Sequence, residues 1–187
     1  AWWNPTGAFY ARSEASYDVP ETDRCFVGLA YVDGIWYYYR NGGVDEKFGG
    51  LVEYNGAKYL VQNGKINWDY TGLVLDNGTW RFVQGGCLNE GYTGLTQYYG
   101  TWYYVENGTL NWGYTGLANY NGSWYAIENG RLNWNYNGLM RYRGTWYYIA
   151  SGCLDWNYTG LTQYYGTWYY VYKGALNWGY SGLIYYN

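Results

Sequence analysis

Histidine is absent from this chain of 187 residues. Without an imidazole, the chain cannot build a Ser-His-Asp or Cys-His catalytic set, a histidine-ligated metal site or a histidine pH switch. Nor does any pair of carboxylates, nucleophile with a base, or metal-ligand cluster recur along the sequence. We therefore expect a non-catalytic protein that needs no cofactor.

Charge and long apolar runs are also scarce. Only 13% of the residues are charged, and 11 basic against 14 acidic residues leave a net charge of −3. This balance provides no basic surface for DNA or RNA and no polybasic patch for a lipid surface. No apolar stretch approaches the roughly 18 residues of a membrane span. We therefore expect neither nucleic-acid binding nor a membrane span.

Aromatic residues are what the sequence has in excess. Tyr (30), Trp (13) and Phe (4) make up a quarter of the chain, and the dipeptide Gly-Leu recurs at intervals of 22 residues, at 28, 50, 72, 94, 116, 138, 160 and 182. A fixed period of this length indicates a repeat protein. We predict seven 22-residue β-hairpin repeats over 28–181, a partial eighth repeat over 182–187 and an irregular N-terminal segment or cap over 1–27.

Each repeat contains the signals of a β-hairpin. The consensus is G-L-x-x-Y-N-G-x-W-Y-Y-V-x-N-G-x-L-N-W-x-Y-T, in which W-Y-Y-V favours a strand. The Asn-Gly that follows it, as at Asn107-Gly108, favours a type I′ turn, and the alternation in L-N-W-x-Y places Leu110, Trp112 and Tyr114 on one strand face. The glycine before the Trp strand marks another tight turn. Because one small hairpin cannot bury enough surface alone, we predict an all-β solenoid of stacked β-hairpins built from 22-residue repeats.

These motifs carry a family resemblance over residues 28–187. The pattern G-x-W-Y-Y-V-x-N-G-x-L, followed by T-G-L, resembles the Gram-positive cell-wall-binding repeat superfamily, with its choline-binding, glucan-binding and clostridial toxin C-terminal repeats. The resemblance implies a β-hairpin solenoid, with about three hairpins per turn in the choline-binding members. It also implies a protein that is secreted or held at the cell surface or cell wall by non-covalent attachment to polymers or glycans.

The resemblance further implies where a ligand binds. In the choline-binding members a quaternary ammonium lies between consecutive hairpins, in a cage made by the first aromatic of W-Y-Y, a later Tyr and the Trp of a T-G-W motif. Here Leu stands in place of that last Trp, as at Leu95 and Leu117, and a Trp instead lies four residues before the Gly. The candidate ligand-binding residues are Trp102, Tyr104, Trp112, Tyr120, Trp124, Trp134, Tyr142, Trp146, Tyr148, Trp156, Tyr164, Trp168, Tyr170 and Trp178.

Every one of these columns also has a structural interpretation. The Trp residues of W-Y-Y and N-W serve either as packing between hairpins or as half-exposed surfaces that stack on sugars or hold a cation. The Asn of N-W bonds either a sugar hydroxyl or the local backbone, and this column contains Asn67, Asn111, Asn133 and Asn177. Repeat 72–93 departs from the consensus at Asp76, Arg81 and Glu90, so we expect its groove to be degenerate or specialised.

Two functions follow from these alternatives. The first is a surface-attachment module whose aromatic grooves bind cell-wall polysaccharide, teichoic acid or a host glycan. The second is a structural or adhesive surface protein in which the rings form the core and the chain self-associates end to end, as a head-to-tail filament subunit.

Cysteine is too rare to form a disulfide framework. The three residues are Cys25, Cys87 and Cys153, of which the last two occupy the same column three repeats apart. That separation is too long for a disulfide. We therefore expect these cysteines to be free, buried or bonded between chains.

Overall fold

The computed structural model describes residues 26–184, and every regular element in that range is a β-strand. Each repeat has a strand of five residues, one of six and one of two. The first strands are β1 (Gly28–Val32), β4 (Gly50–Tyr54), β7 (Gly72–Asp76), β10 (Gly94–Tyr98), β13 (Gly116–Tyr120), β16 (Gly138–Tyr142) and β19 (Gly160–Tyr164). The second strands are β2 (Ile35–Arg40), β5 (Ala57–Gln62), β8 (Thr79–Gln84), β11 (Thr101–Glu106), β14 (Ser123–Glu128), β17 (Thr145–Ala150) and β20 (Thr167–Tyr172). The third strands are β3 (Gly43–Val44), β6 (Lys65–Ile66), β9 (Cys87–Leu88), β12 (Thr109–Leu110), β15 (Arg131–Leu132), β18 (Cys153–Leu154) and β21 (Ala175–Leu176).

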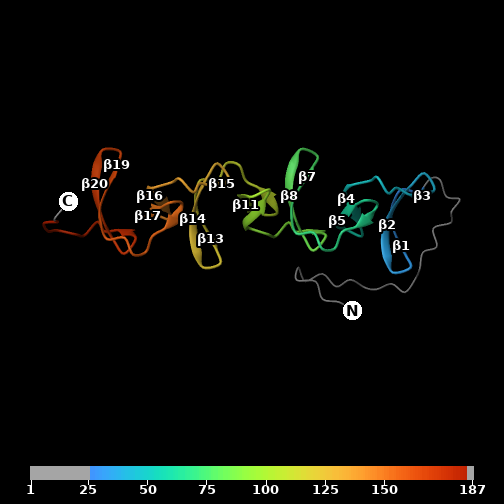
Figure 1. Ribbon diagram of the computed structural model, residues 1–187, viewed down its shortest axis with the longest axis horizontal. Helices are drawn as coiled ribbons and strands as arrows, with labels where there is room; N and C mark the ends of the chain where they lie inside the picture. The colour runs from blue at the N-terminus through green and yellow to red at the C-terminus, as the bar shows by residue number, and fades with distance from the viewer. Residues whose placement is uncertain (1–25, 185–187) are drawn as a thin grey trace. The chain divides into compact units, whose positions relative to one another are not determined.

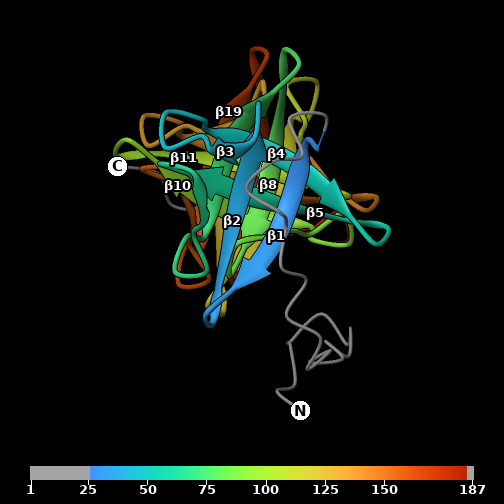
Figure 2. The same ribbon diagram turned by 90° about the vertical axis from the view of Figure 1, so that its right-hand side faces the viewer.

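The main hairpin of each repeat joins its first and second strands in antiparallel register. In β13–β14 the register runs from Gly116 opposite Ile127 to Tyr120 opposite Ser123. Asn121 and Gly122 close this hairpin with φ values of 49° and 83°, the positive values that a type I′ turn requires. Figure 2 shows the same arrangement for β1 and β2, which lie side by side. The predicted fold class, an all-β solenoid of stacked hairpins, is confirmed.

The strand that we predicted as the partner of W-Y-Y-V is shorter than expected. We expected L-N-W-x-Y to form the second strand of the hairpin, whereas only the two residues up to the Leu do so, as in β15. Asn133 ends that strand, because its side-chain oxygen accepts a hydrogen bond from the backbone N–H of Asn135 at 2.9 Å, a local turn that competes with the sheet. Leu110 and Trp112 accordingly do not share a buried face, since they are 6% and 45% exposed.

The short third strand links consecutive hairpins. Besides pairing with the second strand of its own repeat, it pairs with the second strand of the preceding repeat, as Arg131 of β15 does with Tyr103 of β11. Gly130 donates a backbone hydrogen bond to Tyr114 (2.9 Å) and accepts one from Tyr104 (2.9 Å). Backbone bonds therefore tie each hairpin to its neighbour before any side chain is considered.

Two compact units divide the chain, and each is described by itself. The first comprises residues 1–92 with 107–109, and the second comprises 93–106 with 110–187. In the second unit the core is built from the Leu of each first strand and the Val or Ile of each second strand, such as Leu117 (1% exposed) and Ile127 (0%). Val61 (0%) and Leu73 (1%) play the same part in the first unit.

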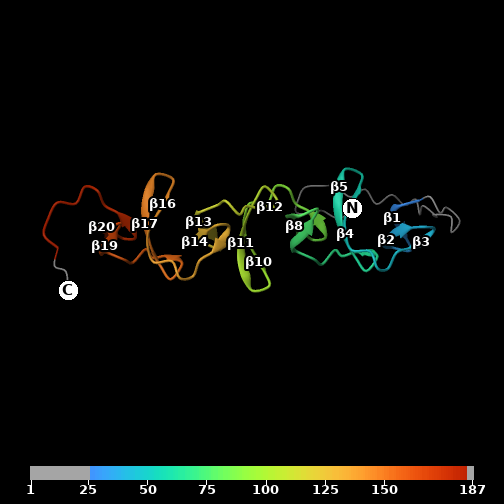
Figure 3. The same ribbon diagram turned by 90° about the horizontal axis from the view of Figure 1, so that it is seen from above.

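The hairpins of the second unit project in different directions. β13–β14 and β19–β20 point to opposite sides in Figure 1, and β10–β11 and β16–β17 do so in Figure 3. Hairpins two positions apart in this unit therefore point to opposite sides.

The predictions for residues 1–25, including the state of Cys25, concern residues outside the described range. Among residues 26–184, no helix is long and apolar enough to cross a membrane.

A pair of glycine substitutions tests the backbone link between hairpins. Gly130 and Gly122 both have positive φ (71° and 83°), but a Cβ on Gly130 would lie 2.5 Å from the carbonyl oxygen of Asn111, whereas one on Gly122 meets nothing within 4 Å. Gly122→Ala should lower the free energy of unfolding by about 1 kcal/mol, the cost of a left-handed alanine. Gly130→Ala should lower it by about 3 kcal/mol or more, because the hairpins must also separate. Urea denaturation measures both, and equal losses would contradict the proposed link.

Candidate functional site

The first set of rings lies between consecutive hairpins and packs on the core. The Trp of each second strand contacts the Tyr that ends the next repeat's first strand, with ring centroids 4.7 to 5.0 Å apart in the second unit. The pairs are Trp102 with Tyr120, Trp124 with Tyr142 and Trp146 with Tyr164. These rings are half-buried and pack against the buried cluster of Leu, Ile and Val. They hold neighbouring hairpins together. Trp168, the equivalent residue in the last hairpin, is 48% exposed.

The second set consists of stacked tyrosines inside the repeat. Tyr104 stacks on Tyr114 at 3.8 Å, and Tyr148 stacks on Tyr158 at 3.6 Å; Tyr170 contacts Tyr180 at 4.2 Å in a tilted arrangement. The Tyr114 hydroxyl donates to the carbonyl oxygen of Leu117 at 2.7 Å. Burial, followed by the nearby Tyr104, raises the pKa of Tyr114 to about 12. The two rings of each pair thus pack against one another, and the second Tyr of each pair donates its hydroxyl to a backbone carbonyl.

The third set is the most open. The middle Tyr of W-Y-Y meets the Trp of N-W edge to face, with centroids 5.8 to 5.9 Å apart and planes inclined by 77° to 84°. We call each such pair an aromatic corner; in the second unit these corners are Tyr103–Trp112, Tyr125–Trp134, Tyr147–Trp156 and Tyr169–Trp178. The four Trp residues are 45%, 51%, 51% and 72% exposed. Two perpendicular rings with exposed area form a surface suited to a small cation or a sugar face.

Sequence reasoning named the Trp of each corner but missed its Tyr. Strand alternation could have found it, because residues i and i+2 share a face. Trp102 and Tyr104 therefore lie on one side of β11 and Tyr103 on the other. The side bearing Trp102 packs on the next hairpin, so the opposite side presents Tyr103.

One corner contains a cation from the chain itself. The Arg131 guanidinium carbon lies 5.1 Å from the centroid of Trp112 and 5.8 Å from that of Tyr103. Beside it is a surface pocket of about 500 Å³, lined by Trp112, Glu128, Asn129, Arg131, Leu132 and Asn133. Glu128 is held at this pocket because its carboxylate accepts a hydrogen bond of 2.6 Å from the Asn133 side-chain nitrogen.

The Asn of N-W is occupied by the protein itself. In all four predicted positions its side-chain oxygen accepts a backbone N–H two residues on, at 2.9 to 3.1 Å; the acceptors are Asn67, Asn111, Asn133 and Asn177. The backbone alternative is therefore the one that the structure contains.

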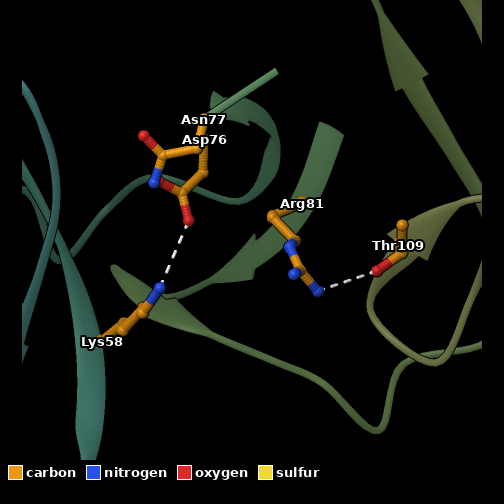
Figure 4. Close-up of polar contacts among 5 residues, drawn as sticks. All are labelled: Lys58, Asp76, Asn77, Arg81 and Thr109. Carbon is orange, nitrogen blue, oxygen red and sulfur yellow. Dashed lines mark hydrogen bonds and ion pairs between the residues drawn. The ribbon is translucent and has the colours of Figure 1, made fainter. Parts of the chain in front are cut away.

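The first unit replaces one inter-hairpin ring pair by an ion pair. Lys58 stands in the column of Trp102, and Asp76 stands in the column of Tyr120. Their charged atoms lie 3.4 Å apart, as Figure 4 shows. In the same figure, the Arg81 guanidinium donates to the Thr109 hydroxyl at 3.0 Å. The predicted departure of repeat 72–93 is thus a specialised polar contact, and Lys58 is the partner that the sequence reading missed.

Other reactive groups are few in the described part of the chain. No group of three or more His, Cys, Asp or Glu residues placed to hold a metal ion occurs there. Cys87 is buried and Cys153 half-buried, and both thiols are free. Burial raises the pKa of the Cys153 thiol, which lowers its reactivity near neutral pH.

The recurring hairpins and ring pairs define a β-hairpin repeat protein. The model of the choline-binding repeat matches residues 26–45, 47–67, 69–89, 91–111, 113–133, 135–155 and 157–177. The chain belongs to the choline-binding repeat family. The comparison with curated proteins gives no match.

Several solved structures are similar to this chain. Choline binding protein F from Streptococcus pneumoniae, solved with a peptidoglycan analogue, is 28% identical over 81% of this chain and 52% of that one, with a TM-score of 0.33. A pneumococcal cell wall endolysin from phage Cp-1, complexed with choline, is 19% identical over 79% and 43%, with a TM-score of 0.33. An alternansucrase complexed with isomaltotriose is 18% identical over 74% and 12%, with a TM-score of 0.36. The chain spans about half the length of choline binding protein F.

The half-buried Tyr114 predicts a loss of stability at alkaline pH. The pKa of Tyr114 is about 12 in the folded chain against about 10 in an unfolded one. Above pH 10 the unfolded state loses protons that the folded state keeps, so the free energy of unfolding should fall between pH 10 and 12 and be unaffected below that window. Urea denaturation at pH 8 and pH 11 measures the fall. Tyr114→Phe should make the fall smaller; an unchanged pH dependence would show that this hydroxyl is not responsible.

Proposed function

We propose that this chain is a non-catalytic attachment module that binds choline-bearing polymers of a Gram-positive cell wall through its aromatic corners. The observation that carries the proposal is that these corners recur in successive repeats of a chain that belongs to the choline-binding repeat family. It follows that the protein containing this module is secreted and held at the cell wall or cell surface. A teichoic acid that displays choline fits these rings better than an uncharged host glycan.

The choice of a cation over a neutral sugar rests on charge. A ring face attracts a cation by roughly 0.5 to 2 kcal/mol, and the Tyr103–Trp112 corner already holds one in Arg131. Glu106 lies in the repeat of the Tyr103–Trp112 corner, and Glu128 lies in the next repeat. Their carboxylates accept hydrogen bonds from the side-chain nitrogens of Asn111 and Asn133 at 2.7 and 2.6 Å. These carboxylates add a negative field that favours an ammonium group.

Multivalency would supply the strength that one corner lacks. A single exposed cation–π contact is weak, but a polymer bearing many headgroups can engage several corners of one chain. The second and later contacts then form at a high effective concentration, so that avidity exceeds the affinity of any one corner. A repeat protein suits this task because each added hairpin adds a corner with the same geometry.

Paired substitutions separate ligand rings from packing rings. Trp134→Ala with Trp156→Ala removes two corners whose indoles are each 51% exposed, so we expect retention on choline resin and on purified wall polymer to fall at least about tenfold. Circular dichroism and the urea midpoint should stay close to those of the wild-type chain, because these rings cover little of the core.

The matched control is Trp124→Ala with Trp146→Ala. These rings pack between hairpins against Tyr142 and Tyr164, so this variant should lose several kcal/mol of stability. Full retention by the corner variant would overturn the proposed function. Loss of folding by the corner variant would instead favour the second function, in which the rings serve only as a scaffold.

A further inference from the structure

The residue facing each corner comes from the third strand of the following repeat. Backbone register places Arg131 opposite Tyr103, Cys153 opposite Tyr125 and Ala175 opposite Tyr147. The three corners have the same ring geometry within 7°, since their planes are inclined by 84°, 80° and 77°. They differ in the facing side chain, which is long and cationic in one case and short and uncharged in the other two.

Arg131 shows what these corners accept. Its guanidinium lies over both rings of the Tyr103–Trp112 corner, where the chain's own cation fills the place that an external one would take. The first unit contains a related contact with a single ring, because Glu46 stands there in the column of the corner Trp. Lys65 faces Tyr37 in the same register, and its ammonium lies 5.3 Å from the ring centroid.

We propose that the third-strand residue decides which corners bind a ligand: Arg131 keeps the Tyr103–Trp112 corner closed, whereas Cys153 and Ala175 leave the next two corners open to a quaternary ammonium headgroup. The inference rests on the proposed function for the identity of the ligand. It goes further by assigning Arg131 as an internal competitor and by naming the corners at Tyr125–Trp134 and Tyr147–Trp156 as the sites. A guanidinium and an external ammonium compete for the same ring faces, so one excludes the other.

The energetics favour the internal cation. Arg131 is tethered by the backbone pairing of β15 with β11, so its contact with the rings requires no association from solution. An external headgroup must instead give up its translational freedom on binding. A free headgroup at ordinary concentrations therefore displaces Arg131 only weakly, whereas it meets no such competitor at Cys153 or Ala175.

The test follows the indole N–H signals of single tryptophans in ¹H–¹⁵N spectra while choline chloride is added. In the wild-type chain, we expect choline to shift the signals of Trp134 and Trp156 and to leave that of Trp112 unmoved. Arg131→Ala should make Trp112 respond over the same choline range as Trp134. Ala175→Arg should abolish the response of Trp156 alone.

Two control variants isolate the position from the charge. Arg143→Ala removes one positive charge from a turn residue whose guanidinium lies 5.2 Å from the Tyr142 ring, and it should leave all three responses as in the wild type. Arg131→Lys keeps a cation at the corner and should leave Trp112 unresponsive. Circular dichroism of each variant verifies that the repeats remain folded.

The outcomes distinguish this inference from the proposed function. The assignment of the third-strand residue is overturned if choline does not shift the Trp112 signal in the folded Arg131→Ala variant. It is also overturned if choline still shifts the Trp156 signal in the folded Ala175→Arg variant. Either result holds even when the wild-type chain is retained on wall polymer. If the wild-type chain is not retained on wall polymer, the proposed function fails. The response of Trp112 in Arg131→Ala then still decides whether the corner accepts a quaternary ammonium.

Discussion

The structure depends on a close backbone contact between consecutive hairpins. At the second turn of the repeat, a glycine with positive φ lies so near the preceding repeat that a Cβ would approach its carbonyl oxygen to between 2.5 and 2.7 Å; these glycines are Gly64, Gly86, Gly108, Gly130, Gly152 and Gly174. The approach allows the amide and carbonyl of the glycine to bond the neighbouring hairpin. A two-stranded hairpin is marginal alone, so these bonds and the rings beside them are what make a stable array.

The contact also divides the aromatic residues into those that pack and those that face solvent. Once two hairpins are joined, the Trp of the second strand and the Tyr of the next first strand are brought to about 5 Å and exclude water from the core. Rings on the opposite strand face, such as Tyr125, also pack against the core. They additionally meet the half-exposed Trp of the loop, as Tyr125 does with Trp134. Aromatic residues thus supply both the packing between hairpins and the exposed ring pairs of the aromatic corners.

The period, the all-β class and both tight turns could be predicted from the sequence, because Gly and Asn mark positive φ wherever they recur. Which turn closes the long hairpin could not, since Asn121-Gly122 and Asn129-Gly130 are the same dipeptide with similar φ values. Their difference is tertiary: a Cβ has open space at Gly122 and clashes with the preceding repeat at Gly130. The exposure of each ring has the same origin. W-Y-Y places three rings in a row, and only the neighbouring hairpin determines which side is covered.

The third strand is where the side chain facing an aromatic corner differs from one repeat to the next. Its first residue contributes backbone pairing, which any side chain permits, and its second residue supplies the core, as Leu132 and Leu176 do (both 9% exposed). The first position is accordingly diverse, with Lys65, Cys87, Thr109, Arg131, Cys153 and Ala175 in successive repeats. Core burial favours an aliphatic residue at the second position, which is Val44 in β3, Ile66 in β6 and Leu in the later repeats, and leaves its neighbour more variable. Sheet structure alternates inward and outward at each step, and in β15 that alternation buries Leu132 in the core and leaves the charged Arg131 exposed.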